Sequence, residues 1–150
     1  MKHKIKKFLF IIPFLGILLY AYSANKPAEI SKDGIIFFEG TWTEALKKSE
    51  AENKPIFLDV STSWCGYCKK MKRNAFSDKE VGSYFNNTFI NVAVDAEQGE
   101  GVAIAQKYNV TGYPTLIILD KNEKVILYAG GYLDTKDFLQ MGKKAIEKSK

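Results

Sequence analysis

The sequence predicts an α/β domain in which a central mixed β-sheet carries helices on both faces. Two buried strand-like runs, 56–60 and 89–94, alternate with helix-like runs, a pattern typical of parallel strands joined by crossover helices. Two further apolar runs, 115–119 and 125–128, flank a short polar turn and predict an antiparallel hairpin. A chain of 150 residues is long enough for one domain with a real core.

The first half of the chain is expected to form a strand, a helix, a second strand and a second helix. Thr41 is followed three residues later by Glu44, a capping-box pattern, so the first helix should begin there. The expected elements are a short strand at 35–38, this helix to about Asn53, a buried strand at 56–60 and a helix from Cys65 to about Asn74.

The second half is expected to add two helices, three strands and a final helix. Phe76, Ser77 and Asp78 should break the preceding helix, and the apolar stripe at 81–85 predicts another helix that stops at Asn86 and Asn87. The remaining elements are a central strand at 89–94, a helix at 102–108, the hairpin around 120–123, a break at Gly130-Gly131, and a helix from Asp134 to about Lys148.

Positive charge is concentrated at the N-terminus. Four of the 22 basic residues lie in the first seven positions, and no acid precedes Glu29. Without residues 1–24 the chain has 18 basic and 17 acidic residues, a formal charge of +1 instead of +5. So balanced a domain lacks the electrostatic footprint of a nucleic-acid-binding protein, and we expect no nucleic-acid partner.

Residues 1–24 have the pattern of a targeting segment. The lysines precede the apolar run 8–22, which has 15 residues and ends among small residues. This order is typical of a secretory signal, and the run is short for a membrane span of about 20 residues. We expect a signal peptide or N-terminal membrane anchor at 1–24, a linker at 25–34 and the folded domain at 35–150, placed outside the cytoplasm in the periplasm or cell envelope.

The two cysteines, Cys65 and Cys68, stand as C-x-x-C between a strand-like run and a helix-like run. Unpaired N–H groups at a helix start stabilise a nearby anion, so the pKa of the Cys65 thiol should fall and its reactivity should rise. Cys68, one turn further on, can close a disulfide and release a bound partner. The spacing therefore favours a redox site.

Two other interpretations of the pair remain open. A structural zinc site usually needs four Cys or His ligands. Besides this cysteine pair the sequence has one histidine, His3, so such a site would require two chains. A purely structural disulfide would close a very short loop and restrict the unfolded chain little. We expect no metal, flavin or nicotinamide site, so electrons must come from a partner protein.

Several separate motifs resemble the thioredoxin family over residues 35–148. Trp64 precedes the cysteine pair, Asp59 stands six residues before Cys65, and Tyr113-Pro114 stands where the family has its cis-proline. Gly130 matches the family's glycine near the last helix. The surrounding stretches are similar to exported thioredoxin-like domains that act as disulfide reductases in the bacterial cell envelope.

The resemblance implies the thioredoxin fold and a role for each site residue. Cys65 would attack, Cys68 would resolve, and Asp59, with a raised pKa, would exchange a proton with Cys68. Pro114 would position the substrate and the backbone of Tyr113 would pair with it. Trp64 and Tyr67 would also contact the substrate.

Three departures from the family bear on function. Tyr67 stands where thioredoxin has proline, at a position that strongly affects the redox potential. Asn91 stands where thioredoxins often have a buried lysine, which removes a charge that would hold Asp59 ionised. The segment 95–114 is longer than in thioredoxin and could shape the choice of partner.

These observations predict an exported enzyme that exchanges electrons with protein thiols and disulfides, and we expect a reductase. A disulfide isomerase or oxidase is the alternative, although no separate dimerisation domain is apparent and a monomer is expected. A peptide-binding or chaperone module and a copper-handling protein are weaker hypotheses. The expected partners are substrate proteins with thiols or disulfides and a membrane redox protein.

Overall fold

The computed structural model describes residues 33–149. The targeting segment predicted at 1–24, and all but the end of the linker predicted at 25–34, lie outside the described residues. The elements are α1 (Trp42–Glu52), β1 (Ile56–Ser61), α2 (Gly66–Arg73), the 3₁₀-helix η1 (Ala75–Ser77), α3 (Lys79–Thr88), β2 (Ile90–Asp95), α4 (Glu100–Lys107), β3 (Thr115–Leu119), β4 (Val125–Gly130) and α5 (Thr135–Lys148).

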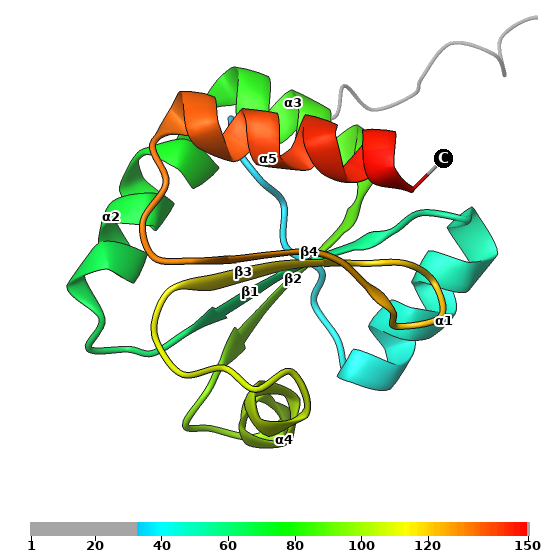
Figure 1. The fold of residues 1–150 in the computed structure, drawn as a ribbon, viewed down its shortest axis with the longest axis horizontal. Coiled ribbons are helices and arrows are strands. Elements are labelled where there is room, and N and C mark those ends of the chain that lie inside the picture. The colour runs from blue at the N-terminus through cyan, green and yellow to red at the C-terminus, as the bar shows by residue number, and fades with distance from the viewer. Residues whose placement is uncertain (1–32, 150) are drawn as a thin grey trace, which may run out of the picture. The chain divides into compact units, whose positions relative to one another are not determined.

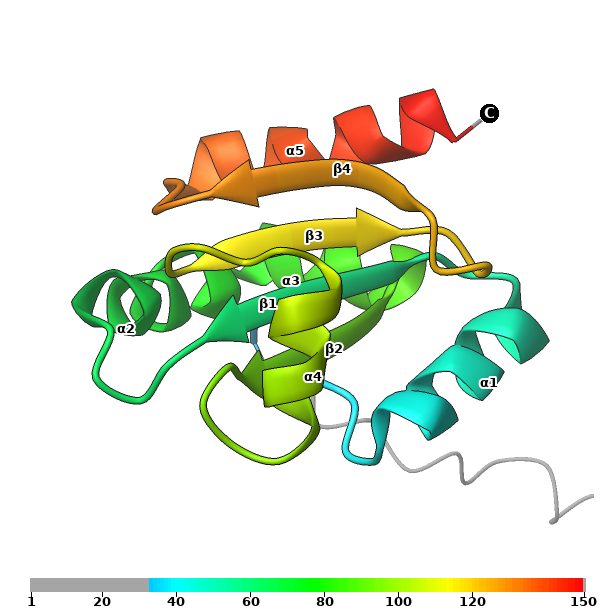
Figure 2. The ribbon, with the colours of Figure 1, turned by 60° about the horizontal axis from the view of Figure 1, so that its bottom comes forward.

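The four strands form one mixed sheet in the order β2-β1-β3-β4. The β1–β2 pair is parallel, whereas β1–β3 and β3–β4 are antiparallel. Figure 1 shows α1 and α4 on one side of this sheet and α2, α3 and α5 on the other, and Figure 2 shows the same layers from a second direction. The predicted fold class, a thioredoxin fold with helices on both faces, is therefore confirmed.

Each face of β1 belongs to a different core. Phe57 packs with apolar residues of α2, α3 and α5, while Ile56, Leu58 and Val60 pack with residues of α1 and α4. The first core is aromatic: the rings of Phe57 and Phe85 lie 5.1 Å apart, and those of Phe85 and Phe138 lie 4.4 Å apart and stacked. All six residues of β1 are buried, because helices cover both faces of the strand.

The predicted start of the first helix is confirmed. The hydroxyl of Thr41 accepts a hydrogen bond from the Glu44 amide, and the Glu44 carboxylate accepts one from the Thr41 amide. The helix ends at Asn53, which adopts the left-handed conformation. The capping box thus fixes where α1 begins beneath the sheet.

The strand predicted at 35–38 is wrong. This segment is extended but forms no regular ladder: the Phe38 amide bonds to the Asn91 carbonyl of β2, whereas the Ile35 amide bonds to the Phe76 carbonyl and the Ile36 amide to the side chain of Asn86. The segment also approaches α3 closely, since a Cβ at Gly82 would lie 2.3 Å from the backbone of Gly34. It therefore wraps the end of the sheet instead of extending it.

The place of one strand in the sheet and the ends of two elements also differ from the predictions. The strand predicted as central, β2, lies at one end of the sheet; the segment at 35–38 and the adjoining helices cover it, so its sequence resembles that of a central strand. Asn86 and Asn87 lie inside α3, where side-chain bonds to Gly34 and Ser83 carbonyls satisfy them. β4 continues through Gly130 and does not break before it.

The hairpin turn predicted at 120–123 is present and is tied to the helices below it. The Glu123 carboxylate accepts hydrogen bonds from the Trp42 indole, the Lys107 ammonium and the Tyr108 hydroxyl. Glu123 itself has a φ of 62°, a region that residues other than glycine seldom occupy. These bonds hold the turn against α1 and α4.

No helix within residues 33–149 is both long and apolar enough to cross a membrane. The same residues contain no group of three His, Cys, Asp or Glu side chains that could hold a metal ion.

Candidate active site around the cysteine pair

Cys65 and Cys68 lie at the junction of β1 and α2 and are joined in a disulfide, with their Cα atoms 5.3 Å apart. Cys65 is the N-cap of α2, and its Sγ accepts a hydrogen bond of 3.1 Å from the Cys68 amide. The two side chains are only 5% and 2% exposed, respectively. The disulfide is therefore shielded, and its reaction requires a partner that docks directly against it.

The position of Cys65 supplies the electrostatics of a reactive thiolate. The first turn of a helix has amide groups without intrahelical partners, and their partial positive charge stabilises an anion beside them. The Cys68 amide already points at the Cys65 sulfur in the disulfide form. When the pair is reduced, the same donor would stabilise negative charge on Cys65, so this residue is placed to be the nucleophile.

Asp59 lies on the face of β1 that α2 covers, on the same side as Phe57, and is 1% exposed. Burial raises the pKa of Asp59 from an ordinary 3.8 to about 7, and the Lys72 ammonium and Ser61 hydroxyl only partly oppose this rise. Neither carboxylate oxygen makes a hydrogen bond of good geometry among the described residues. An acid in this state can take up or release a proton near neutral pH.

The cation that faces Asp59 comes from α2 and was not predicted from the sequence. The Asn91 amide points elsewhere, donating to the Ile36 carbonyl and to the Asn86 side chain. Lys72, one helical turn after Cys68, supplies positive charge toward Asp59 instead. The spacing of four residues within α2 is the signal that could have indicated it.

Trp64 and Tyr113 form one flank of the pair. Their rings lie 5.9 Å apart edge to face, and the Trp64 indole donates a 3.0 Å hydrogen bond to Glu97. The bond between Tyr113 and Pro114 is cis, and Pro114 is buried. Trp64 is 63% exposed, so a large apolar ring beside the disulfide remains available for contact.

Tyr67 and Tyr132 form the other flank. Tyr67 is 64% exposed and its ring lies 6.3 Å from that of Tyr132, which follows β4. The Lys70 ammonium lies 4.4 Å above the Tyr132 ring, and the Asn74 amide donates to the Tyr132 hydroxyl at 3.5 Å. The sequence analysis did not predict three residues of the flanks, because no short-range pattern indicates residues that come together only after folding. These residues are Tyr132, Lys70 and Glu97.

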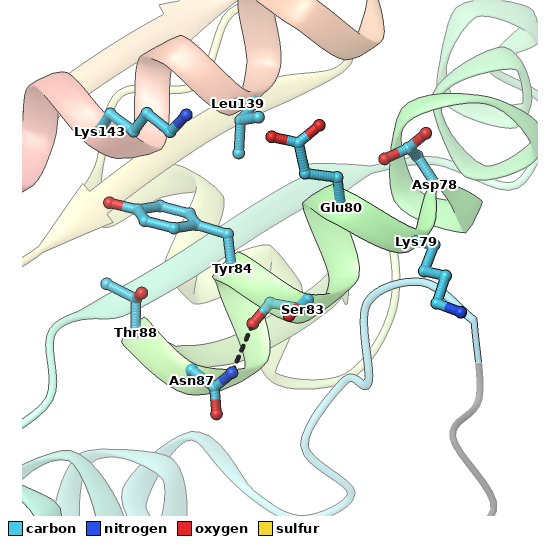
Figure 3. A pocket seen from close by; sticks show the side chains of 9 residues that line it. All are labelled: Asp78, Lys79, Glu80, Ser83, Tyr84, Asn87, Thr88, Leu139 and Lys143. Carbon is cyan, nitrogen blue, oxygen red and sulfur yellow. Dashed lines mark hydrogen bonds between the residues drawn. The ribbon is translucent and has the colours of Figure 1, made fainter.

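The hollow between α3 and α5 is separate from this site. It has a volume of about 710 Å³ and is lined by residues of these two helices and of the turn before α3, among them Tyr84, Leu139 and Lys143. Figure 3 shows its polar lining, with Asn87 bonded back to Ser83 in its own helix. The cysteines lie instead on a surface between exposed aromatic rings, which suits a protein partner better than a small molecule.

Comparison with known proteins agrees with this geometry. A family model described as a thioredoxin-like domain matches residues 42–146. A protein of Bacteroides thetaiotaomicron described as a proposed disulphide-isomerase has a similar solution structure, with a TM-score of 0.69 and 41% sequence identity over 77% of this chain and 95% of that one. A thioredoxin from Thermus thermophilus shares the fold at a TM-score of 0.67 and 22% identity, covering 75% of this chain and 88% of that one.

Among curated relatives, the thiol:disulfide interchange protein DsbD of Yersinia pestis is 35% identical over 95 residues, which is 61% of this chain. The chain spans only 16% of the length of that relative. This chain has a cysteine pair joined in a disulfide, as expected of a thiol–disulfide oxidoreductase of the DsbD and thioredoxin type. Fold, disulfide and family model agree, and the chain belongs to the thioredoxin-like domain family.

Proposed function

We propose that this protein is an exported reductase that transfers electrons from its Cys65–Cys68 dithiol to disulfides of other proteins. The observation that carries the proposal is the position of the disulfide: it lies at the start of α2, with a buried acid of pKa about 7 on the face that α2 covers. The reductase direction rests on the resemblance to envelope reductase domains, and export rests on the pattern of residues 1–24.

The reaction needs two exchanges. The Cys65 thiolate attacks one sulfur of the substrate disulfide, forms a mixed disulfide and releases the first substrate thiol. Cys68 then loses its proton, which we assign to the Asp59 carboxylate, and attacks the Cys65 sulfur. The second substrate sulfur leaves as a thiolate, so two electrons have passed to the substrate while Cys65–Cys68 has become a disulfide. The two substrate thiolates take their protons from solvent and from the protonated Asp59. A dithiol of a second protein, proposed to be membrane-bound, must restore the reduced pair.

The aromatic flanks would hold the substrate during both exchanges. Trp64 and Tyr67 would contact its apolar side chains, and the backbone of Tyr113, presented by Pro114, would pair with its extended chain. The exposure of both rings beside a nearly buried disulfide supports this arrangement. We also propose that residues 1–24 either are cleaved as a signal peptide or stay attached as a membrane anchor. The mass of the exported protein distinguishes the two, because cleavage would lower it.

The similar protein of Bacteroides thetaiotaomicron favours a second candidate, a disulfide isomerase. An isomerase would release misfolded proteins from their mixed disulfides without net transfer of electrons. Refolding of scrambled ribonuclease separates the two functions, because a reductase alone lowers the number of disulfides without restoring ribonuclease activity.

Reduction of insulin by dithiothreitol tests the proposed chemistry. We expect Cys65→Ser to lose all acceleration, and Ser63→Ala, an exposed neighbour, to retain it. Cys68→Ser should accumulate a mixed disulfide with insulin, because the resolving thiol is missing. Insulin reduction by Cys65→Ser at the wild-type rate would show that the pair does not perform the exchange and would favour a peptide-binding module.

A further inference from the structure

The outward side of α2 carries three exposed cations next to the disulfide. Arg73 lies four residues after Lys69 and three after Lys70, so both lysines are neighbours of Arg73 on the exposed side of the helix. We call these three residues the basic stripe. It continues from Gly66, which lies between the cysteines and where an added Cβ would meet nothing within 4 Å. The surface at Gly66, between the cysteines, is therefore open to a docked chain.

The stripe has no counter-charge of its own within residues 33–149. The ion pairs formed there involve Lys48, Lys54 and Lys107, and none involves a cation of α2. The helix dipole favours basic residues in the last turn, which accounts for Lys70 and Arg73. It does not account for Lys69, which lies outside that turn. The dipole therefore does not explain why a third cation, Lys69, joins Lys70 and Arg73 beside the cysteine pair.

The two flanks of the cysteine pair differ in charge. On the Trp64 flank the indole donates to Glu97, an exposed acid. On the Tyr67 flank the Lys70 ammonium lies over the Tyr132 ring. A docked chain would thus meet an aromatic surface on both sides but positive charge only on the α2 side.

We propose that the basic stripe is a docking surface for a redox partner with acidic side chains next to its reacting disulfide. This inference rests on the proposed function, because the partner must exchange disulfides with Cys65. Opposite charges attract over about 10 Å at 0.1 M ionic strength, so the stripe would speed the encounter and orient the partner's disulfide over Gly66. The exchange itself is unchanged: the Cys65 thiolate displaces a partner thiolate, and Cys68 displaces the second.

The test compares three disulfide peptides of the same length, each with one internal disulfide. They differ only in having three aspartates, three glutamines or three lysines beside one cysteine. The full-length protein is reduced beforehand and mixed with each peptide, and the rate of peptide reduction is measured. At low ionic strength we expect the acidic peptide to react about tenfold faster than the glutamine peptide, the lower end of the range for electrostatic steering. The advantage should shrink steadily with added salt.

The variant that tests the stripe replaces its three cations by glutamine. The matched control replaces three exposed lysines of α1 and α5 by glutamine, so that both variants lose the same net charge. We expect the ratio of acidic to neutral peptide rates to fall to near 1 in the stripe variant and to remain high in the control. The stripe variant is Lys69→Gln, Lys70→Gln, Arg73→Gln, and the control is Lys47→Gln, Lys144→Gln, Lys148→Gln.

Each outcome has a distinct meaning. An equal rate ratio in the two variants, or a wild-type ratio near 1 at low salt, would overturn the docking surface while leaving the exchange reaction in place. Because the salt series uses the wild-type protein, it decides the matter even where a variant folds poorly. Failure of the wild-type protein to reduce any of the three peptides would instead overturn the proposed function.

Discussion

Two acids on opposite faces of the sheet have environments that shift their pKa values in opposite directions. Asp59 is buried on the face covered by α2, and neither of its oxygens has a hydrogen-bond partner of good geometry among the described residues. Glu123 lies against α1 and α4 and accepts from Trp42, Lys107 and Tyr108. Burial raises the pKa of Asp59 to about 7, whereas the bond from Lys107 lowers the pKa of Glu123.

This difference distinguishes an acid that stabilises the fold from an acid that is suited to proton transfer. Glu123 is satisfied as an anion, so it stabilises the fold wherever it is ionised, and it holds a hairpin turn in place. Asp59 is unsatisfied as an anion, and its ionisation destabilises the fold at the pH where the site must work. The ionisation of Asp59 thus costs free energy in the core, on the face covered by the helix that carries the cysteines. Such a cost is expected of a residue that transfers protons and not of a structural residue.

The largest expected effect is on the pH dependence of stability through Asp59. Its pKa is raised on folding, so its stabilising contribution is complete below pH about 4 and is lost as the pH rises through about 7. The loss should approach about 4 kcal/mol, the equivalent of the rise from 3.8 to about 7. Urea unfolding of the oxidised protein at pH 4 to 9 should show this loss in wild type and not in Asp59→Asn.

Glu50→Gln is the control for Asp59, because Glu50 is an exposed acid of α1. It should leave the pH profile of wild type intact. A profile of Asp59→Asn that runs parallel to that of wild type would mean that Asp59 is ionised at ordinary pH, and it would remove Asp59 from the proposed proton transfer.

A smaller effect of opposite sign is expected for Glu123. Its pKa is lowered on folding, so its contribution is present above pH about 4.5 and is lost as the pH falls below that value. Glu123→Gln removes the ion pair with Lys107 and should cost about 1 kcal/mol or less at pH 7, because the group is partly exposed. The same urea series, extended down to pH 3, should show this cost fading. A cost that grows as the pH falls would contradict the pairing.

The sequence was sufficient for the features that depend on local pattern. Cys65 as an N-cap, Asp59 in an apolar strand and the Thr41 capping box all follow from residue types at short spacing, and all three are present. The cis bond before Pro114 came from the family resemblance and is also present. The positions of these residues were therefore predictable before any contact was known.

The features that could not be predicted depend on residues far apart in the chain. Trp64 meets Glu97 across 33 positions, and Tyr67 meets Tyr132 only after β4 has joined the sheet. The segment at 35–38 has the composition of a strand, but its hydrogen bonds go to scattered partners, among them the side chain of Asn86 in α3 and both the side chain and the backbone carbonyl of Asn91 in β2. Spacing along the sequence does not indicate such long-range contacts, which form only when the chain folds.

The most direct measurement is the reduction potential of the Cys65–Cys68 pair, obtained by equilibrating the protein in glutathione buffers and counting free thiols by alkylation and mass. A reductase should have a potential near that of thioredoxin, about −270 mV, so that electrons flow from the pair to substrate disulfides. A potential of about −120 mV would mean that the pair withdraws electrons and makes disulfides, and it would contradict the proposed direction of transfer.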